Sequence, residues 1–291
     1  MYQKNPENLD HIKTIIDQYD LYFIDLWGVI HNGVKLFDNA INVIFKLKEL
    51  EKKVVLISNA PRTNSSVKTF LEKLNFDCHI IDLLVTSGDL TQKYILNNED
   101  KTFFHLGPKK DHDLFFEIKN LSNKVEESDE IICTGLIHEI GKNIGDYENF
   151  FNKCIDLKVK FICANPDEVV SRGNQIEFCA GALAKYYKKL GGQVRYFGKP
   201  YIEIYEEGHA LIQKETGNVF SKDKILAIGD NLKTDIAGAQ NYEIDSVLIL
   251  NGIYKDFFRD GNLNFNNLIK SNEIESVITV SYTHLTLPTK A

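Results

Sequence analysis

The chain has 291 residues, of which 43% are hydrophobic and 26% are charged, and its formal net charge is −7. These values are typical of a globular protein and argue against nucleic-acid binding, which needs a basic face. The longest apolar runs are the size of strands and fall well short of the roughly 20 residues that span a bilayer. We therefore expect neither a nucleic-acid partner nor a membrane partner.

The first residues are polar and lack the apolar segment of a secretory signal. The five cysteines include no Cys-x-x-Cys pair, which argues against a zinc site, and an odd count without a secretory signal argues against disulfides. These features predict a cytoplasmic protein with reduced thiols.

Short apolar runs alternate along the chain with segments whose apolar residues have helical spacing. In chain order, strands are expected at 21–24, 54–57, 102–106, 130–133, 160–163, 225–228 and 246–250. Helices are expected at about 39–52, 64–75, 111–119, 147–155 and 179–189, and from about Thr234 onward. Strands that alternate with helices and are apolar on both faces predict a parallel α/β sheet.

The expected fold is a doubly wound, Rossmann-like α/β core that carries an inserted α/β cap domain. The core would comprise residues 1–83 and 191–279, and the cap residues 84–190. The segment 280–291 is expected to be an artefact, because Val-Ser-Tyr-Thr-His-Leu-Thr-Leu-Pro-Thr reads like a translated sequencing adapter. Resequencing with long reads would test that expectation.

Polar clusters follow three of the predicted strands. They are Asp25 in Phe-Ile-Asp-Leu-Trp-Gly-Val, Ser58-Asn59 in Leu-Ile-Ser-Asn-Ala, and Asp230 with Asp235 in Gly-Asp-Asn-Leu-Lys-Thr-Asp. A fourth cluster is Lys199 in Gly-Lys-Pro. Because ligands bind at the carboxyl ends of strands in an open parallel sheet, these side chains are expected to converge there.

This set of side chains suits phosphoryl transfer. A carboxylate can attack phosphorus, and several carboxylates in one crevice need a cation, for which oxygen ligands favour Mg²⁺. A lysine and a hydroxyl add positive charge and hydrogen bonds for the phosphoryl oxygens. The sequence therefore predicts a Mg²⁺-dependent enzyme acting on a small phosphorylated substrate.

The four motifs, in this order, resemble those of the haloacid dehalogenase superfamily. Gly198-Lys199-Pro200 and the long insert before it resemble the class IIA subfamily, which includes NagD-type, nitrophenyl and phosphoglycolate phosphatases. Asn165-Pro166-Asp167 and Cys179-Ala-Gly-Ala-Leu-Ala resemble the cap of that group, which makes Asn165 and Asp167 tentative substrate residues. The resemblance covers about residues 18–255.

The resemblance implies a role for each motif residue. Asp25 would be the nucleophile and a metal ligand, Ser58 and Asn59 would bind phosphate, and Lys199 would steady both the nucleophile and the phosphoryl group. Metal would be held by Asp230 and the backbone carbonyl of Trp27, with Asp235 supporting the site. The resemblance also implies that a homodimer is possible.

Trp27 departs from the family pattern. The phosphatases of the family have a second Asp at this position as general acid and base, and an indole N–H cannot take that role. Losing a positioned acid typically costs on the order of 10²–10⁴ in rate. One consequence is a preference for aryl or acyl phosphates, whose leaving groups need little protonation.

His31 is an alternative proton donor. The segment 29–36 reads as a hairpin with an Asn32-Gly33 type I′ turn, which would place His31 near the nucleophile.

Two rival functions are a binding protein that holds a phosphorylated ligand without rapid turnover, and a phosphotransferase. Retention of Asp25, Lys199 and Asp230 favours the hydrolase, since a protein that only binds its ligand needs no nucleophile.

Overall fold

The computed structural model describes residues 7–9, 12–172, 175–250, 268, 271–274 and 277–280. A seven-stranded sheet has the order β1-β14-β13-β12-β2-β3-β4, and all its neighbouring strands are parallel. Its strands are β1 (Glu7–Leu9), β2 (Leu21–Ile24), β3 (Lys53–Ser58), β4 (Leu83–Thr86), β12 (Ile225–Gly229), β13 (Asp245–Ile249) and β14 (Ile278–Val280). The expected parallel α/β sheet is therefore confirmed.

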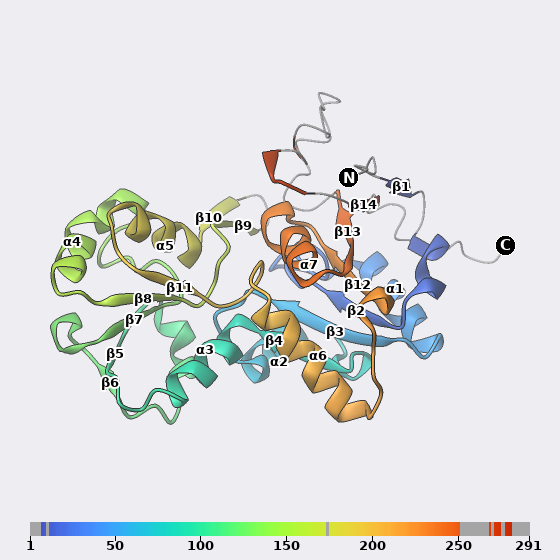
Figure 1. Ribbon diagram of the computed structural model, residues 1–291, viewed down its shortest axis with the longest axis horizontal. Helices are drawn as coiled ribbons and strands as arrows, with labels where there is room; N and C mark the ends of the chain where they lie inside the picture. Colours follow the sequence, from blue (N-terminus) through green and yellow to red (C-terminus); the bar gives the residue numbers. More distant parts are fainter. Residues whose placement is uncertain are drawn as a thin grey trace.

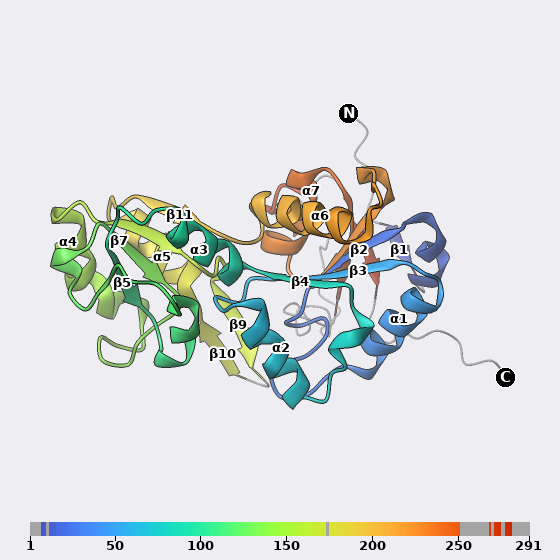
Figure 2. The same cartoon turned by 90° about the horizontal axis from the view of Figure 1, so that it is seen from below.

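Helices cover both faces of this sheet. Alternate residues of β2 point to opposite faces, so that Tyr22 and Ile24 join one apolar cluster while Leu21 and Phe23 join another. The first cluster contains residues of α1 (Asp38–Glu49) and α2 (Asn64–Lys73), and the second contains residues of α6 (Glu203–Thr216) and α7 (Ala237–Tyr242). Figure 2 shows the two helix pairs on opposite sides of the strands, which is the doubly wound arrangement.

A second, five-stranded sheet lies beside the first (Figure 1). Its order is β11-β8-β7-β5-β6, again all parallel. The strands are β5 (Phe103–Leu106), β6 (Leu121–Ser122), β7 (Glu130–Cys133), β8 (Lys160–Cys163) and β11 (Val194–Tyr196). An antiparallel hairpin of β9 (Val169–Arg172) and β10 (Gln175–Phe178) is attached to it.

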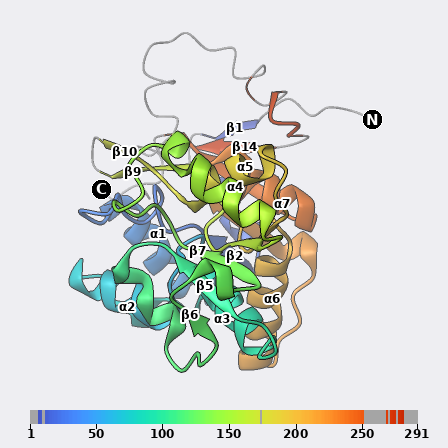
Figure 3. The same ribbon diagram turned by 90° about the vertical axis from the view of Figure 1, so that its left-hand side faces the viewer.

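The second sheet also has two covered faces. Residues of α4 (Glu148–Asp156) and α5 (Ala180–Lys189) share one apolar cluster with it, and residues of α3 (Ser87–Leu96) share the cluster that continues into the larger sheet. We call the described residues within 87–196, which contain the five-stranded sheet, α3, α4, α5, the hairpin and their connections, the five-stranded unit, and the other described residues the seven-stranded unit. Figure 3 views the molecule from the side of the five-stranded unit, which lies in front of the larger sheet.

Short helices complete the connections. The 3-10 helices are Ile12–Thr14, Ile16–Gln18, Cys78–Ile80, Lys109–Phe115, Val125–Glu127, Ile144–Tyr147 and Lys222–Lys224, and a π-helix spans Leu232–Ile236. Among the described residues, no helix is both long and apolar enough to cross a membrane.

Every predicted strand is present, and those at 21–24, 130–133 and 160–163 have the predicted bounds. Near the predicted boundaries at 83/84 and 190/191, β4 pairs with β3 of the larger sheet and β11 pairs with β8 of the second sheet. The division into core and cap stays a prediction. Residues 281–291 of the suspected artefact lie outside the described part of the chain.

The helix predicted at 111–119 was wrong. The segment is the 3-10 helix Lys109–Phe115, with hydrogen bonds such as Asp111 N to Pro108 O, and Glu117 at φ +69° ends the right-handed winding. The hairpin near residue 31 exists, but the predicted Asn32-Gly33 turn was misplaced by one residue. Asn32 N donates to Lys35 O, and only Gly33, at φ +80°, has the positive φ that the first central position of a type II′ turn needs.

Removing a side chain between the large sheet and α6 should destabilise the protein strongly. Phe23 is 2% exposed and packs against the Tyr205 ring at 5.9 Å. We expect Phe23→Ala to lower the free energy of unfolding by about 3–5 kcal/mol in urea denaturation. Phe45→Ala, which removes a ring that is 47% exposed on α1, should cost less than about 1 kcal/mol. Equal losses for the two variants would contradict this packing.

Candidate functional site

Three carboxylates meet at the carboxyl end of the large sheet. Asp25 follows β2 and Asp230 follows β12, and these two strands are parallel neighbours. Asp235 comes from the π-helix after β12, and each of the three residues offers an oxygen within 4.8 Å of the others. The sequence predicted this convergence from two separated motifs, of which the second carries both Asp230 and Asp235.

Lys199 places its ammonium group among these carboxylates. Its Nζ contacts Asp25 Oδ1, donates to Asp235 Oδ1 at 2.6 Å and donates to the Ile57 carbonyl at 3.0 Å. Burial alone would lower the lysine pKa, but the charges of Asp235 and Asp25 outweigh it and raise the pKa. Lys199 is therefore a permanent cation, and it is only 3% exposed.

Asn59 fixes the backbone that carries this lysine. Its side-chain Oδ1 accepts from Lys199 N at 2.7 Å, and its Nδ2 donates to Lys199 O at 3.1 Å. The chain approaches so closely that a Cβ on Gly198, whose φ is +112°, would run into the Asn59 amide. This contact explains why the Gly-Lys-Pro motif begins with glycine.

Asp235 organises the acidic loop from inside. Its Oδ2 accepts the backbone N–H groups of Asp230 and Asn231, both at 3.1 Å, while Oδ1 faces Lys199. A Cβ on Gly229 would overlap the Asp235 side chain. Asp235 therefore holds both the Asp230 loop and the lysine in position.

The acidic cluster fits a divalent cation. Lys199 supplies one positive charge against three buried carboxylates, so the cluster keeps an excess of negative charge. Burial raises the pKa of Asp25 against the opposing effect of Lys199, and a bound cation would lower it. A Cβ on Gly28, at φ +89°, would overlap the Asp230 carboxylate, so glycine there keeps the oxygen cradle open. Hard oxygen donors of this kind suit Mg²⁺.

These residues lie in a cleft of about 1760 Å³ between the two units. Asp25, Trp27, Ser58, Asn59 and Lys199 all line it. The Ser58 hydroxyl accepts from Ala60 N at 3.2 Å, and the residue is 5% exposed. The structure thus brings the predicted phosphate-binding pair to the same cleft as Asp25.

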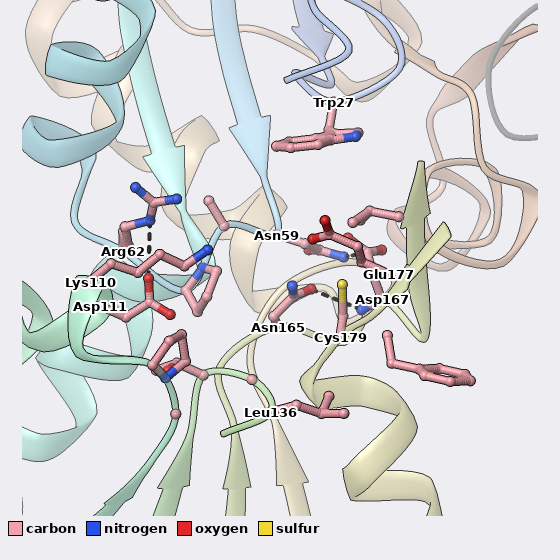
Figure 4. Close-up of a pocket in the computed structure, with 18 of the residues that line it drawn as sticks. Trp27, Asn59, Arg62, Lys110, Asp111, Leu136, Asn165, Asp167, Glu177 and Cys179 are labelled. Carbon is pink, nitrogen blue, oxygen red and sulfur yellow. Dashed lines mark hydrogen bonds and ion pairs between the residues drawn. The ribbon is translucent and has the colours of Figure 1, made fainter. Parts of the chain in front are cut away.

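Trp27 lies across the top of the cleft in Figure 4. Its indole Nε1 donates to the carbonyl of Ser171 in β9 at 2.8 Å, a contact between the two units. The ring packs so closely on Gly33 that a Cβ there would collide with it. Trp27 therefore ties the hairpin β9–β10 to the loop after β2.

The structure does not support His31 as a proton donor. Its side chain is 2% exposed, does not line the cleft, and packs edge-on against Trp27 and Phe70. Nδ1 accepts from Gly33 N at 3.0 Å, and burial lowers the pKa of His31 to about 4. The imidazole is therefore neutral near pH 7 and serves the turn.

Asn165 and Asp167, which were expected to meet substrate, line the cleft. Asp167 Oδ1 accepts from Asn59 Nδ2 at 3.0 Å, and Asp167 N donates to Asn165 Oδ1 at 3.0 Å (Figure 4). Gly181 N of α5 donates to Asp167 O at 3.1 Å, and a Cβ on Gly181 would strike the loop backbone. The glycine of Cys-Ala-Gly-Ala thus allows α5 to press against the Asn-Pro-Asp loop.

Sequence reasoning missed one pair at the cleft. Arg62, after β3, forms an ion pair with Asp111 of the five-stranded unit, with Nε and Oδ1 at 3.2 Å (Figure 4). No motif marked either residue, because an ion pair between distant segments leaves no pattern in a single sequence.

Comparisons with known proteins agree with this geometry. The family model described as haloacid dehalogenase-like hydrolase matches residues 22–119, and a related HAD hydrolase-like model matches residues 196–261. A crystal structure of a haloacid dehalogenase-like hydrolase from Brucella suis is 30% identical, covers 94% of this chain and 98% of its own, and has a TM-score of 0.82. The chain belongs to the haloacid dehalogenase-like hydrolases.

Two curated relatives of this haloacid dehalogenase-like chain are similar over most of their length. A 4-nitrophenylphosphatase from Schizosaccharomyces pombe is 24% identical and covers 84% of this chain and 88% of its own. A 5′-nucleotidase from Bacillus subtilis is 23% identical and covers 81% and 89%. The expected membership of the superfamily and the expected enzyme class, a HAD-type hydrolase, are confirmed.

Removing the buried ammonium group should leave the carboxylates uncompensated. We expect Lys199→Met, measured by urea denaturation at pH 7 in a chelating buffer, to lower the free energy of unfolding by about 3–5 kcal/mol. The matched control is Lys222→Met, whose partner Glu243 is largely exposed, and it should cost no more than about 1 kcal/mol. A Lys199 variant as stable as this control would contradict the buried ion-pair network.

Proposed function

We propose that this chain is a phosphatase that hydrolyses a small phosphorylated metabolite with Mg²⁺ bound, through an aspartyl-phosphate on Asp25. The observation that carries the proposal is the pairing of Asp25 with Lys199. The Lys199 ammonium group contacts the buried carboxylate of Asp25, which lies at the end of β2 inside a cleft large enough for a small molecule. A carboxylate held in this way suits attack on phosphorus better than passive binding.

Each neighbouring group has a task in this reaction. Lys199 neutralises charge on the transferring phosphoryl group, and the Ser58 hydroxyl and Asn59 orient it. Asp25, Asp230 and the Trp27 carbonyl would hold the cation, and Asp235 supports them through its backbone hydrogen bonds. Mg²⁺ would supply Lewis-acid stabilisation of the phosphoryl oxygens.

The named activities of the relatives support the reaction class. A 4-nitrophenylphosphatase and a 5′-nucleotidase both cleave phosphate monoesters, and each resembles this chain over most of its length. We extend that class, phosphate monoesters, to this chain.

The five-stranded unit would act as the cap. The contacts that join it to the seven-stranded unit around the cleft include Trp27 with Ser171, Asn59 with Asp167, and Arg62 with Asp111. A cap held by such contacts would exclude water and select the substrate.

We also propose a cytoplasmic location, in keeping with five cysteines that are all free thiols. The homodimer stays a prediction.

Replacing the nucleophile should abolish turnover. In a screen of phosphate monoesters with Mg²⁺, we expect Asp25→Asn to lower phosphate release by more than about 10³-fold, because an amide cannot form the acyl phosphate. Asp223→Asn, the same change at an exposed residue, should retain wild-type rates.

The same screen separates the rival functions. Tight ligand binding without phosphate release would favour a binding protein, and loss of the ester with no free phosphate would favour a phosphotransferase. Phosphate release that survives in Asp25→Asn would sink the proposed mechanism.

A further inference from the structure

An acid is missing from the position where this family carries one, and the cleft offers a carboxyl group from the opposite side. Trp27 cannot donate a proton to a leaving oxygen, and His31 is buried outside the lining of the cleft. A replacement has to be an ionisable group that lines the cleft near Asp25.

The cleft-lining carboxyl groups divide by environment within the described residues. Asp25, Asp230 and Asp235 form the cation cluster, and Asp111 is paired with Arg62. Glu139 and Glu177 are exposed. Asp167 remains. The Asn59 side chain binds both Asp167 Oδ1 and the backbone of Lys199, and the Lys199 ammonium group contacts Asp25, so Asn59 and Lys199 link the two carboxyl groups.

We propose that Asp167, carried by the Asn-Pro-Asp loop of the five-stranded unit, donates the proton to the leaving group in place of the carboxyl group that Trp27 replaces. This inference rests on the proposed phosphatase function. Asp167 is held on Asn59, the neighbour of Ser58, and so it lies beside the expected phosphate pocket rather than at the cleft mouth. Its backbone is fixed on both sides, by Asn165 Oδ1 and by Gly181 N.

The surroundings of Asp167 suit an acid that works near neutral pH. Burial raises its pKa, Lys199 and the hydrogen bonds from Asn59 and Thr234 lower it, and Asp235 raises it, with a result of about 6. From its own unit, Cys179, which lies below it in Figure 4, is an ionisable neighbour of Asp167, and the charge of Glu177 on β10 acts in turn on Cys179. A substantial fraction is thus protonated near pH 6, where general acids are effective.

The proposed step balances in both halves of the reaction. Asp25 bonds to phosphorus as the P–O bond to the leaving group breaks, the bonding electrons pass to the leaving oxygen, and the Asp167 proton joins it to give an alcohol. The Asp167 carboxylate then accepts a proton from the water that attacks the aspartyl-phosphate. This second step releases inorganic phosphate and restores the Asp25 carboxylate and the Asp167 acid.

Two substrates of nearly equal shape test the proposal. The leaving group of 4-nitrophenyl phosphate needs little protonation, whereas that of 4-nitrobenzyl phosphate is an alkoxide that needs a proton. We expect Asp167→Asn to lower kcat/KM by about 10²–10⁴ for the benzyl ester but by less than about tenfold for the phenyl ester. Retained turnover of the phenyl ester also reports a folded variant. The fall of the benzyl rate above about pH 6 should disappear in the variant.

The matched control is Glu168→Gln, the next residue, whose carboxylate faces Lys185 at 3.0 Å. It should leave both rates unchanged. Equal losses of kcat/KM on the two esters in Asp167→Asn would mean that Asp167 serves only as a contact between the units. No loss on either ester would mean that Asp167 has no role in the reaction. In both cases Asp25→Asn would still abolish turnover. Wild-type protein without phosphatase activity would overturn the proposed function and this inference together.

Discussion

The buried contact of Lys199 with Asp25 and Asp235 is the interaction on which the rest of the site depends. An ammonium group that is 3% exposed has to be paired, and the two carboxylates have to be compensated, so neither side is stable alone. This requirement fixes the surrounding chain. Asn59 holds the lysine backbone, Asp235 holds the acidic loop, and glycines stand wherever a Cβ would separate these parts. The single positive charge of Lys199 cannot balance the three carboxylates of Asp25, Asp230 and Asp235, and so the cluster suits a divalent ion.

The second sheet brings polar groups to this cluster from the opposite side. The contacts at the cleft described above join segments far apart in the chain, as with Trp27 and Ser171, which are 144 residues apart. Trp27 therefore stands, in the loop after β2, at the position where the family has an acid, and its indole anchors the hairpin over the cleft. In the proposed mechanism the lost proton donor returns from the five-stranded unit, so that protonation of the leaving group would depend on closure of that unit over the substrate.

The sequence predicted what short-range patterns can carry. Buried parallel strands are apolar on both faces, so their approximate bounds could be predicted, and polar residues at their ends were predicted to meet, as they do in the cleft. The start of α3 could also have been predicted, because Thr86 and Asp89 form a capping box, but this signal was missed. The helix predicted at 111–119 failed because apolar spacing does not distinguish an α-helix from a 3-10 segment that ends at a left-handed residue. The contacts of Trp27 with Ser171 and of Asp167 with Asn59 could not be predicted from the sequence, because they form only in the tertiary structure.

The most direct measurement is a crystal structure of the protein grown with Mg²⁺ and beryllofluoride, a mimic of a phosphoryl group bound to a carboxylate. The account predicts beryllium bonded to an Asp25 oxygen, the Lys199 ammonium group beside its fluorides, and the cation in contact with Asp25 and Asp230. Beryllofluoride elsewhere in the cleft, or a cation that leaves the Asp25–Asp230 pair untouched, would contradict it.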